Sequence, residues 1–122
     1  MELPERITIV GIGIMGASLA LALKARGYAG KITGVARTEA TCASALARGA
    51  VDIATTDLRT GVGQADLVVL ATPARLLIDQ IAVCGESCRD GAVITDMGST
   101  KSAIVAAMNA LPNRLAAVGG HP

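Results

Sequence analysis

The stretch that decides the fold is Ile7-Thr8-Ile9-Val10-Gly11-Ile12-Gly13-Ile14-Met15-Gly16. Its first four residues are β-branched, as is typical of a buried strand. The next six match the pattern G-x-G-x-x-G, and an Ala/Leu-rich stretch over 15–26 then predicts a helix. A strand, a glycine-rich turn and a helix start in this order form the context in which the pattern predicts dinucleotide binding.

Each glycine of this pattern has its own expected role. Gly11 permits the tight turn, Gly13 lets the backbone approach a pyrophosphate, and Gly16 lets the helix pack closely on the strand. The backbone at Ile14 and Met15 begins the helix, where free N–H groups and the positive end of the helix dipole favour phosphate. An ordinary glycine turn is the alternative, and the flanking strand and helix argue against it.

The rest of the chain alternates short β-branched runs with Ala/Leu-rich stretches. After the first strand over 7–10, further strands are predicted over 31–35, 52–55, 67–71, 92–95 and 115–118. Further helices are predicted from the N-cap Thr38 to about 48, from 75 to about 84 and over 101–111. This alternation predicts an α/β protein with an NAD(P)-binding Rossmann fold: a doubly wound parallel sheet with helices on both faces. At 122 residues the chain, 1–122, is one such domain.

The composition excludes several classes of protein. The chain is 52% hydrophobic and 17% charged, which is incompatible with intrinsic disorder. Eleven Lys and Arg residues against ten Asp and Glu residues, with Tyr28 as the single aromatic residue, argue against a nucleic-acid surface. The core is therefore expected to consist of Ala, Val, Ile and Leu side chains.

The cysteines and the N-terminus indicate a compartment. Cys42, Cys84 and Cys88 are an odd number, which fits a reducing environment better than a disulfide framework. No metal site is expected, because the pair Cys84 and Cys88 lacks further ligands. The first residues do not form a signal peptide, and no apolar run reaches the ~18 residues of a membrane span. We expect a soluble, cytoplasmic protein without membrane contacts.

The end of the second predicted strand indicates which dinucleotide is bound. An NAD-binding domain usually has Asp or Glu here to bind the ribose 2′-hydroxyl, and this chain has Ala36. Arg37 follows and could pair with a 2′-phosphate, while Thr38 could donate a hydrogen bond to it. NADP is therefore favoured over NAD. The alternative is that Arg37 is a solvated surface charge.

Two further segments are expected at the carboxyl ends of strands, where ligands bind in this fold. Ala71, Thr72 and Pro73 close the fourth strand and are candidate cofactor contacts, although a plain turn explains them equally well. Gly98, in the segment Thr95-Asp96-Met97-Gly98-Ser99-Thr100-Lys101 after the fifth strand, is a further candidate.

Ser99 and His121 are candidates for chemistry. Each follows a predicted strand at the edge where the cofactor is expected. A histidine and a hydroxyl that converge near a nicotinamide form a plausible acid/base pair. The alternatives are that Ser99 caps the following helix and that His121 has no role.

These motifs together resemble the prephenate/arogenate dehydrogenase family of tyrosine biosynthesis. The resemblance is carried by 11–16, by Ala71-Thr72-Pro73, by 95–101 and by Gly119-Gly120-His121-Pro122, so it covers essentially the whole chain. It implies oxidative decarboxylation of prephenate or arogenate. It also implies that His121 accepts a hydrogen bond from the substrate's ring hydroxyl and that Ser99 orients His121.

The resemblance has consequences for the rest of the protein. In that family a helical domain follows the nucleotide-binding domain, forms the homodimer and completes the substrate site. The chain therefore looks truncated after Pro122, and we expect it to be inactive alone. The segment Gly34-Val35-Ala36-Arg37-Thr38 is similar to that of the NADP-using members.

Two other functions are considered. One is a different two-domain NADP reductase, such as a β-hydroxyacid dehydrogenase or an imine reductase, which should lack the ending Gly-Gly-His-Pro. The other is a stand-alone dinucleotide-binding regulatory module, which gives Ser99 and His121 no purpose.

Overall fold

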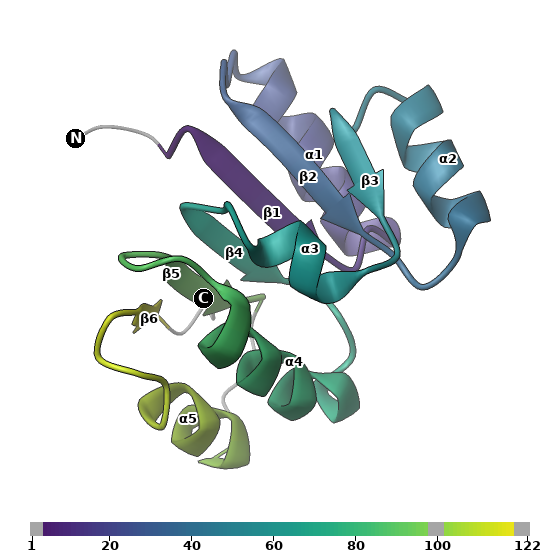
Figure 1. Ribbon diagram of the computed structural model, residues 1–122. Helices are drawn as coiled ribbons and strands as arrows, with labels where there is room; N and C mark the ends of the chain where they lie inside the picture. Colours follow the sequence, from purple (N-terminus) through teal and green to yellow (C-terminus); the bar gives the residue numbers. More distant parts are fainter. Residues whose placement is uncertain (1–3, 98–101, 119–122) are drawn as a thin grey trace.

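A parallel sheet in the order β3-β2-β1-β4-β5-β6 forms the centre of the protein (Figure 1). The computed structural model describes residues 4–97 and 102–118. The strands in these ranges are β1 Arg6–Val10, β2 Lys31–Val35, β3 Ile53–Thr55, β4 Leu67–Leu70, β5 Val93–Asp96 and β6 Ala116–Val118. The helices there are α1 Ile14–Ala25, α2 Glu39–Ala47, α3 Leu58–Val62, α4 Ala74–Ser87 and α5 Ser102–Asn109. The predicted doubly wound α/β fold is confirmed.

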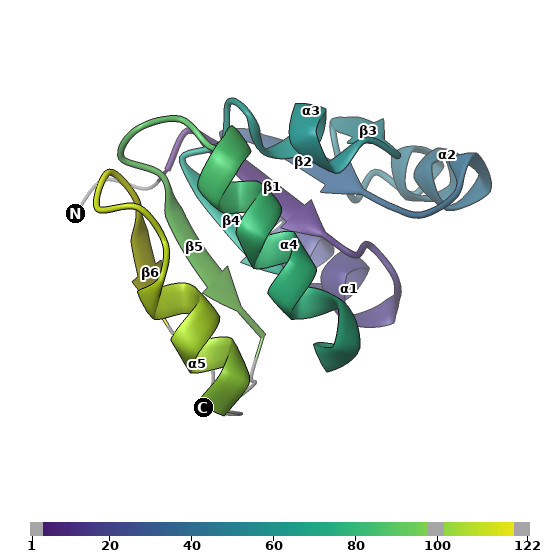
Figure 2. The same ribbon diagram turned by 60° about the horizontal axis from the view of Figure 1, so that its bottom comes forward.

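Helices cover both faces of the sheet. On one face, α1 and α2 pack over β1 and β2, and their core includes Ile9, Ala20 and Ile32, each 0% exposed. On the other face, α3, α4 and α5 lie side by side (Figure 2), and their core includes Val68 and Ile94. These core residues are aliphatic, as the near absence of aromatic residues requires. The small alanine side chains let the helices approach the sheet closely.

The predicted elements are present, and some of their bounds were wrong by one residue or more. The largest difference is in α4, which was expected to end near Cys84 and continues through Gly85 to Ser87. A Cβ at Gly85 would lie 3.3 Å from Leu111 Cδ2, so the glycine permits close packing of the chain after α5. Packing therefore outweighs the weak helix propensity of glycine.

The third predicted strand begins one residue later than expected, at Ile53, because the side chain of Asp52 bonds to neighbouring elements. Its carboxylate accepts a hydrogen bond from the Ile32 N–H at 2.8 Å and pairs with Lys24 Nζ at 2.7 Å. The Lys24 hydrogen bond is the largest cause that lowers the pKa of Asp52. Asp52 thus ties α1 to the start of the β2–β3 ladder.

Helix α3 was missed by the sequence analysis. It has five residues, begins after the N-cap Asp57, whose side chain accepts a hydrogen bond from the Arg59 N–H, and contains Gly61. A Cβ at Gly61 would lie 2.3 Å from Val35 Cγ2, and the buried Thr8 hydroxyl donates to the Gly61 carbonyl at 2.6 Å. Contacts with distant residues therefore stabilise this helix, which is too short for its cap alone to predict it.

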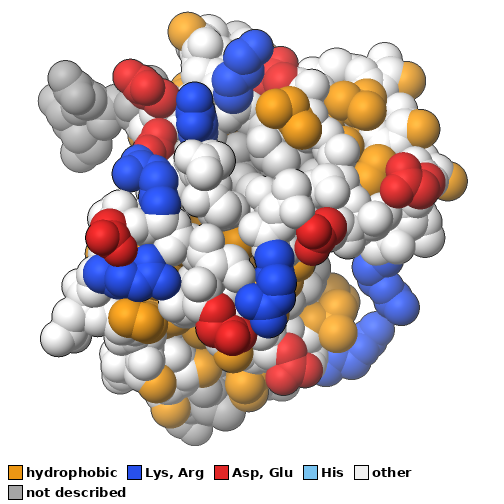
Figure 3. Space-filling model, in the orientation of Figure 1, with side chains coloured by type: hydrophobic (Ala, Val, Ile, Leu, Met, Phe, Trp, Pro, Cys, Tyr) orange, Lys and Arg blue, Asp and Glu red, His pale blue; other side chains and the backbone are white. Residues whose placement is uncertain are grey.

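The cysteines lie inside the fold, whereas charged side chains lie on the surface. Cys42, Cys84 and Cys88 are all buried and free. On the face in Figure 3, basic and acidic side chains are intermixed. Within 4–97 and 102–118, no helix is long and apolar enough to cross a bilayer, and no cluster of three His, Cys, Asp or Glu residues could hold a metal ion.

Candidate functional site

The candidate site lies where the strand order reverses. Strand β1 pairs with β2 on one side and with β4 on the other, and all three are parallel. The chain turns away from the sheet after Val10 and after Leu70, which are register partners. Ligands bind outside the carboxyl ends of the strands at such a switch point.

The glycine turn after β1 has the geometry that its sequence predicts. Gly11 has a φ of +91°, which favours glycine, and its N–H donates to the Val35 carbonyl at 2.8 Å. A Cβ at Gly16 would lie 2.0 Å from the Gly11 carbonyl oxygen, so α1 packs directly against the turn. A Cβ at Gly13 would have no heavy atom within 4 Å. The turn is therefore tightly packed at Gly11 and Gly16, whereas the space beside Gly13 is open.

The first turn of α1 is suited to an anion. Gly13 is the N-cap residue, and the first turn contains no acidic residue and no side-chain cap among the residues described. The Ala17 N–H donates to the Gly13 carbonyl at 2.9 Å, so the earlier N–H groups lie outside the helix ladder. Ile14 and Met15 are 89% and 57% exposed. A pyrophosphate can reach this backbone through the open space at Gly13.

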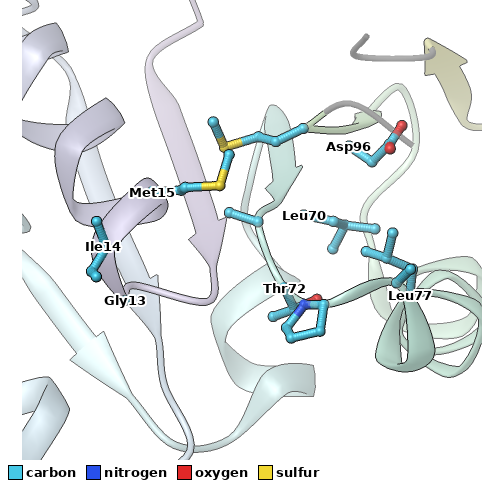
Figure 4. Close-up of a pocket in the computed structure, with 11 residues that line it drawn as sticks. Gly13, Ile14, Met15, Leu70, Thr72, Leu77 and Asp96 are labelled. Carbon is cyan, nitrogen blue, oxygen red and sulfur yellow. The ribbon is translucent and has the colours of Figure 1, made fainter. Parts of the chain in front are cut away.

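A cavity of about 530 Å³ lies on one side of the turn (Figure 4). The predicted residues Gly13, Ile14, Met15, Ala71, Thr72 and Pro73 line it, together with Leu70, Ala74, Leu77, Asp96 and Met97. Most of these side chains are apolar. Asp96, at the end of β5, is only 2% exposed and supplies a carboxylate. The sequence analysis gave Asp96 no role, although it lines this cavity.

A second cavity, of about 160 Å³, lies on the other side of the turn. Gly11, Ala36, Arg37 and Thr72 line it, as do residues that the sequence analysis missed: Val10, Val35, Thr56, Leu58, Leu76 and Gln80. Thr72 is the residue common to the two cavities. A further cavity, of about 360 Å³, lies between the start of α1 and α2 and is lined in part by Gly13 and Ile14. The first two cavities lie on either side of the glycine turn and leave space there for a ligand with two nucleoside halves.

The end of β2 shapes this second cavity. Ala36 is buried, and its N–H donates to the Thr55 carbonyl at 3.1 Å. Arg37 is exposed. Thr38 is the N-cap of α2, as predicted, because its Oγ1 accepts a hydrogen bond from the Thr41 N–H at 3.1 Å. The same hydroxyl donates to Thr41 Oγ1 at 3.0 Å, and Thr38 does not line the cavity of Arg37, so its predicted contact with the cofactor stays a prediction. Because Thr38 forms the cap, the side chain of Arg37 takes no part in it and can turn toward a ligand.

Three predicted site residues, Gly98, Ser99 and His121, lie outside the described residues, so their roles stay predictions. The strands before them are described. β5 and β6 are parallel neighbours, and Thr95 is the register partner of Val118. Both strands therefore run toward the same edge of the sheet, the edge that holds the glycine turn.

Comparison with known proteins gives the same family. The family model described as the nucleotide-binding domain of prephenate dehydrogenase matches residues 19–122. The chain is similar to the prephenate dehydrogenase of Bacillus subtilis, with 33% identity over 99% of this chain and 33% of that protein. It thus spans about a third of the length of this relative.

Solved structures agree. The prephenate dehydrogenase of A. aeolicus, in complex with hydroxyphenyl propionate and NAD⁺, superposes with a TM-score of 0.85 and 30% identity, over 100% of this chain and 42% of that chain. The arogenate dehydrogenase of Synechocystis gives a TM-score of 0.83 and 35% identity, over 96% and 40%. On the family match, the fold and these relatives, the chain belongs to the family of prephenate dehydrogenase nucleotide-binding domains.

Proposed function

We propose that the chain is the cofactor-binding part of a prephenate or arogenate dehydrogenase of tyrosine biosynthesis that uses NADP. The observation that carries the cofactor part of this proposal is the glycine turn, with open space at Gly13 and a cavity on either side. The substrate part is supported by the similarity to prephenate and arogenate dehydrogenases. The larger cavity suits the nicotinamide half, because apolar walls such as Leu70 and Leu77 exclude water. The smaller cavity, with Arg37, suits the adenosine half.

The proposed reaction is an oxidative decarboxylation. Bound NADP⁺ supplies the hydride acceptor. The hydride comes from the ring carbon that has the hydroxyl, the bond to the ring carboxylate breaks, and CO₂ leaves as the ring becomes aromatic. His121 would accept a hydrogen bond from that hydroxyl, and Ser99 would orient His121. The turn at Gly13 and the start of α1 would hold the pyrophosphate.

The reaction can be tested directly with the whole protein that contains this chain. We expect NADPH to form, with release of CO₂, when prephenate or arogenate is added with NADP⁺. The gene should also restore growth without tyrosine to a strain that lacks this activity. Binding of NADPH without turnover of either substrate would contradict the substrate assignment and leave the cofactor assignment standing.

We also propose that a further helical domain completes the substrate site and the homodimer. The support is that the similar prephenate dehydrogenases are about three times as long as the matched region. Residues 1–122 would then be the nucleotide-binding domain of a larger catalytic unit. On this proposal, residues 1–122 expressed alone bind dinucleotide and show no turnover.

The preference for NADP rests on Arg37. A charge-assisted hydrogen bond contributes about 1.5–3 kcal/mol, so NADPH should bind at least about tenfold more tightly than NADH. The substitution Arg37→Ala should remove this difference by weakening NADPH and should leave NADH nearly unchanged. Titration of intrinsic NAD(P)H fluorescence measures both affinities. Equal affinities in the unsubstituted protein would overturn the preference.

The substitution Glu39→Gln is a matched control for Arg37→Ala, because it removes a negative charge where Arg37→Ala removes a positive one. Glu39 is exposed in the first turn of α2, and its carboxylate accepts a hydrogen bond at 3.4 Å from Thr56, which lines the same cavity as Arg37. Its charge opposes a 2′-phosphate. Glu39→Gln should therefore tighten NADPH about two- to fivefold, as expected for an exposed charge, and leave NADH unchanged. A loss of NADPH affinity in this variant would place the 2′-phosphate elsewhere.

A further inference from the structure

A polar pair links the end of β4 to α4 at the boundary between the two cavities. The Thr72 Oγ1 donates a hydrogen bond to the Gln80 Oε1 at 2.5 Å, and both side chains are half-buried. Gln80 lines the smaller cavity with Leu76, which lies one helical turn earlier. A Cβ at Gly11 would lie 2.5 Å from Thr72 Cγ2, so Thr72 packs against the glycine turn.

The direction of this hydrogen bond determines what the pair can offer a ligand. A threonine hydroxyl has one proton, and here Gln80 accepts it. Because the amide oxygen of Gln80 is engaged, its Nε2 group contributes the two remaining N–H donors. Gln80 lines the cavity, and its remaining hydrogen-bonding groups are donors, so it suits a ligand atom that accepts hydrogen bonds.

The other residues that line the smaller cavity indicate which class of ligand it can hold. Its walls include the apolar side chains of Val10, Val35, Leu58 and Leu76. The basic group among its lining residues is Arg37, at the end of β2, whereas Gln80 comes from α4. A flat aromatic base with acceptor nitrogens suits apolar walls and an amide donor, and the ring nitrogens of adenine are acceptors.

We propose that Gln80 binds the adenosine half of the cofactor, with Nε2 donating a hydrogen bond to a ring nitrogen of adenine. Leu76 packs against the base, and the Thr72 hydroxyl fixes the orientation of the amide. This inference rests on the proposed function, because it assumes that a dinucleotide binds across the two cavities.

The test uses ligands that represent each half of the cofactor. Dissociation constants of NADPH, 2′,5′-ADP and nicotinamide mononucleotide are measured for the unsubstituted protein and for Gln80→Met, which keeps the size and removes the amide. We expect NADPH and 2′,5′-ADP to weaken by the same factor of about three to ten, the range of one neutral hydrogen bond. Nicotinamide mononucleotide should be unaffected. Asn109→Met, an exposed amide on α5 outside both cavities, is the control and should change none of the three.

A second variant separates contact with the base from mere support of Thr72. Gln80→Glu keeps an oxygen that accepts the Thr72 proton but has no N–H donor. We expect it to weaken 2′,5′-ADP at least as much as Gln80→Met, at about 0.5 M salt to screen the added charge. Normal binding of 2′,5′-ADP by Gln80→Glu would mean that Gln80 only positions Thr72, and would overturn the proposal.

Other outcomes distinguish this inference from the proposed function. Suppose that the unsubstituted protein binds NADPH and that Gln80→Met binds 2′,5′-ADP as tightly as the unsubstituted protein does. The role proposed for Gln80 is then wrong, and the proposed function stands. If Gln80→Met weakens both half-ligands alike and lowers the Tm, the effect is structural and the role is also wrong. If the unsubstituted protein binds no dinucleotide, both proposals fail.

Discussion

Replacing Gly13 with alanine should weaken NADPH about 10- to 100-fold and leave the Tm nearly unchanged. The added Cβ would project into open space, with no heavy atom within 4 Å, so we expect no loss of stability. That space is where the pyrophosphate must approach the backbone. Overlap between a methyl group and the phosphate would cost about 1–3 kcal/mol, which corresponds to this loss of affinity.

Gly16→Ala should behave differently. Its Cβ would lie 2.0 Å from the Gly11 carbonyl oxygen and 3.2 Å from Ile9 Cγ2, so α1 must move away from the turn. We expect the free energy of unfolding to fall by about 1–3 kcal/mol, with a lower Tm, and dinucleotide binding to fall with it. The same backbone atoms hold α1 and shape the phosphate site.

Thermal unfolding and NADPH titration on the same samples separate the two effects. Gly63→Ala is the control, because its Cβ would meet its nearest neighbour, the Arg59 carbonyl oxygen, at an ordinary 3.4 Å. This control should change neither quantity. Normal NADPH affinity in Gly13→Ala would show that the phosphates do not lie against the turn. An unchanged Tm in Gly16→Ala would contradict the close packing of α1.

The glycine turn was predictable because its signals are local. The β-branched run, the three glycines and the following alanines are adjacent in the chain, and each has a direct conformational meaning. The cap at Thr38 has the same origin, since its hydrogen bond spans three residues. The parallel sheet with helices on both faces follows from the alternation of strands and helices with right-handed crossovers.

The parts of the site that the sequence did not indicate depend on how packing places individual side chains. On α4, the buried residues Leu77, Ile81 and Cys84 define the face toward the core. Gln80 lies at the edge of that face, and helical spacing cannot tell that it meets Thr72. Asp96 is similar, because a carboxylate at a strand end gives no sign from sequence that it is 2% exposed.

In the whole protein, replacing His121 with asparagine should lower kcat about 10²- to 10⁴-fold, the usual contribution of a positioned acid/base group. The affinity for NADPH should hardly change, because the proposed partner of His121 is the hydroxyl of the substrate. The described strands support this assignment: β5 and β6 lead the chain toward the edge that holds the glycine turn. The imidazole must be neutral to accept a hydrogen bond, and the ordinary pKa of histidine is about 6.5. Activity should therefore decline as the pH falls through that region.

Ser99→Ala should cost less than His121→Asn, because serine orients the imidazole and takes no proton itself. The losses in the double variant should be less than additive, since two residues that act as one unit lose their function together. Steady-state kinetics on both single variants and the double variant measure this coupling. Strictly additive losses would mean that Ser99 and His121 act independently. A near-normal kcat in His121→Asn, or a loss that appears only as weaker NADPH binding, would remove His121 from the reaction.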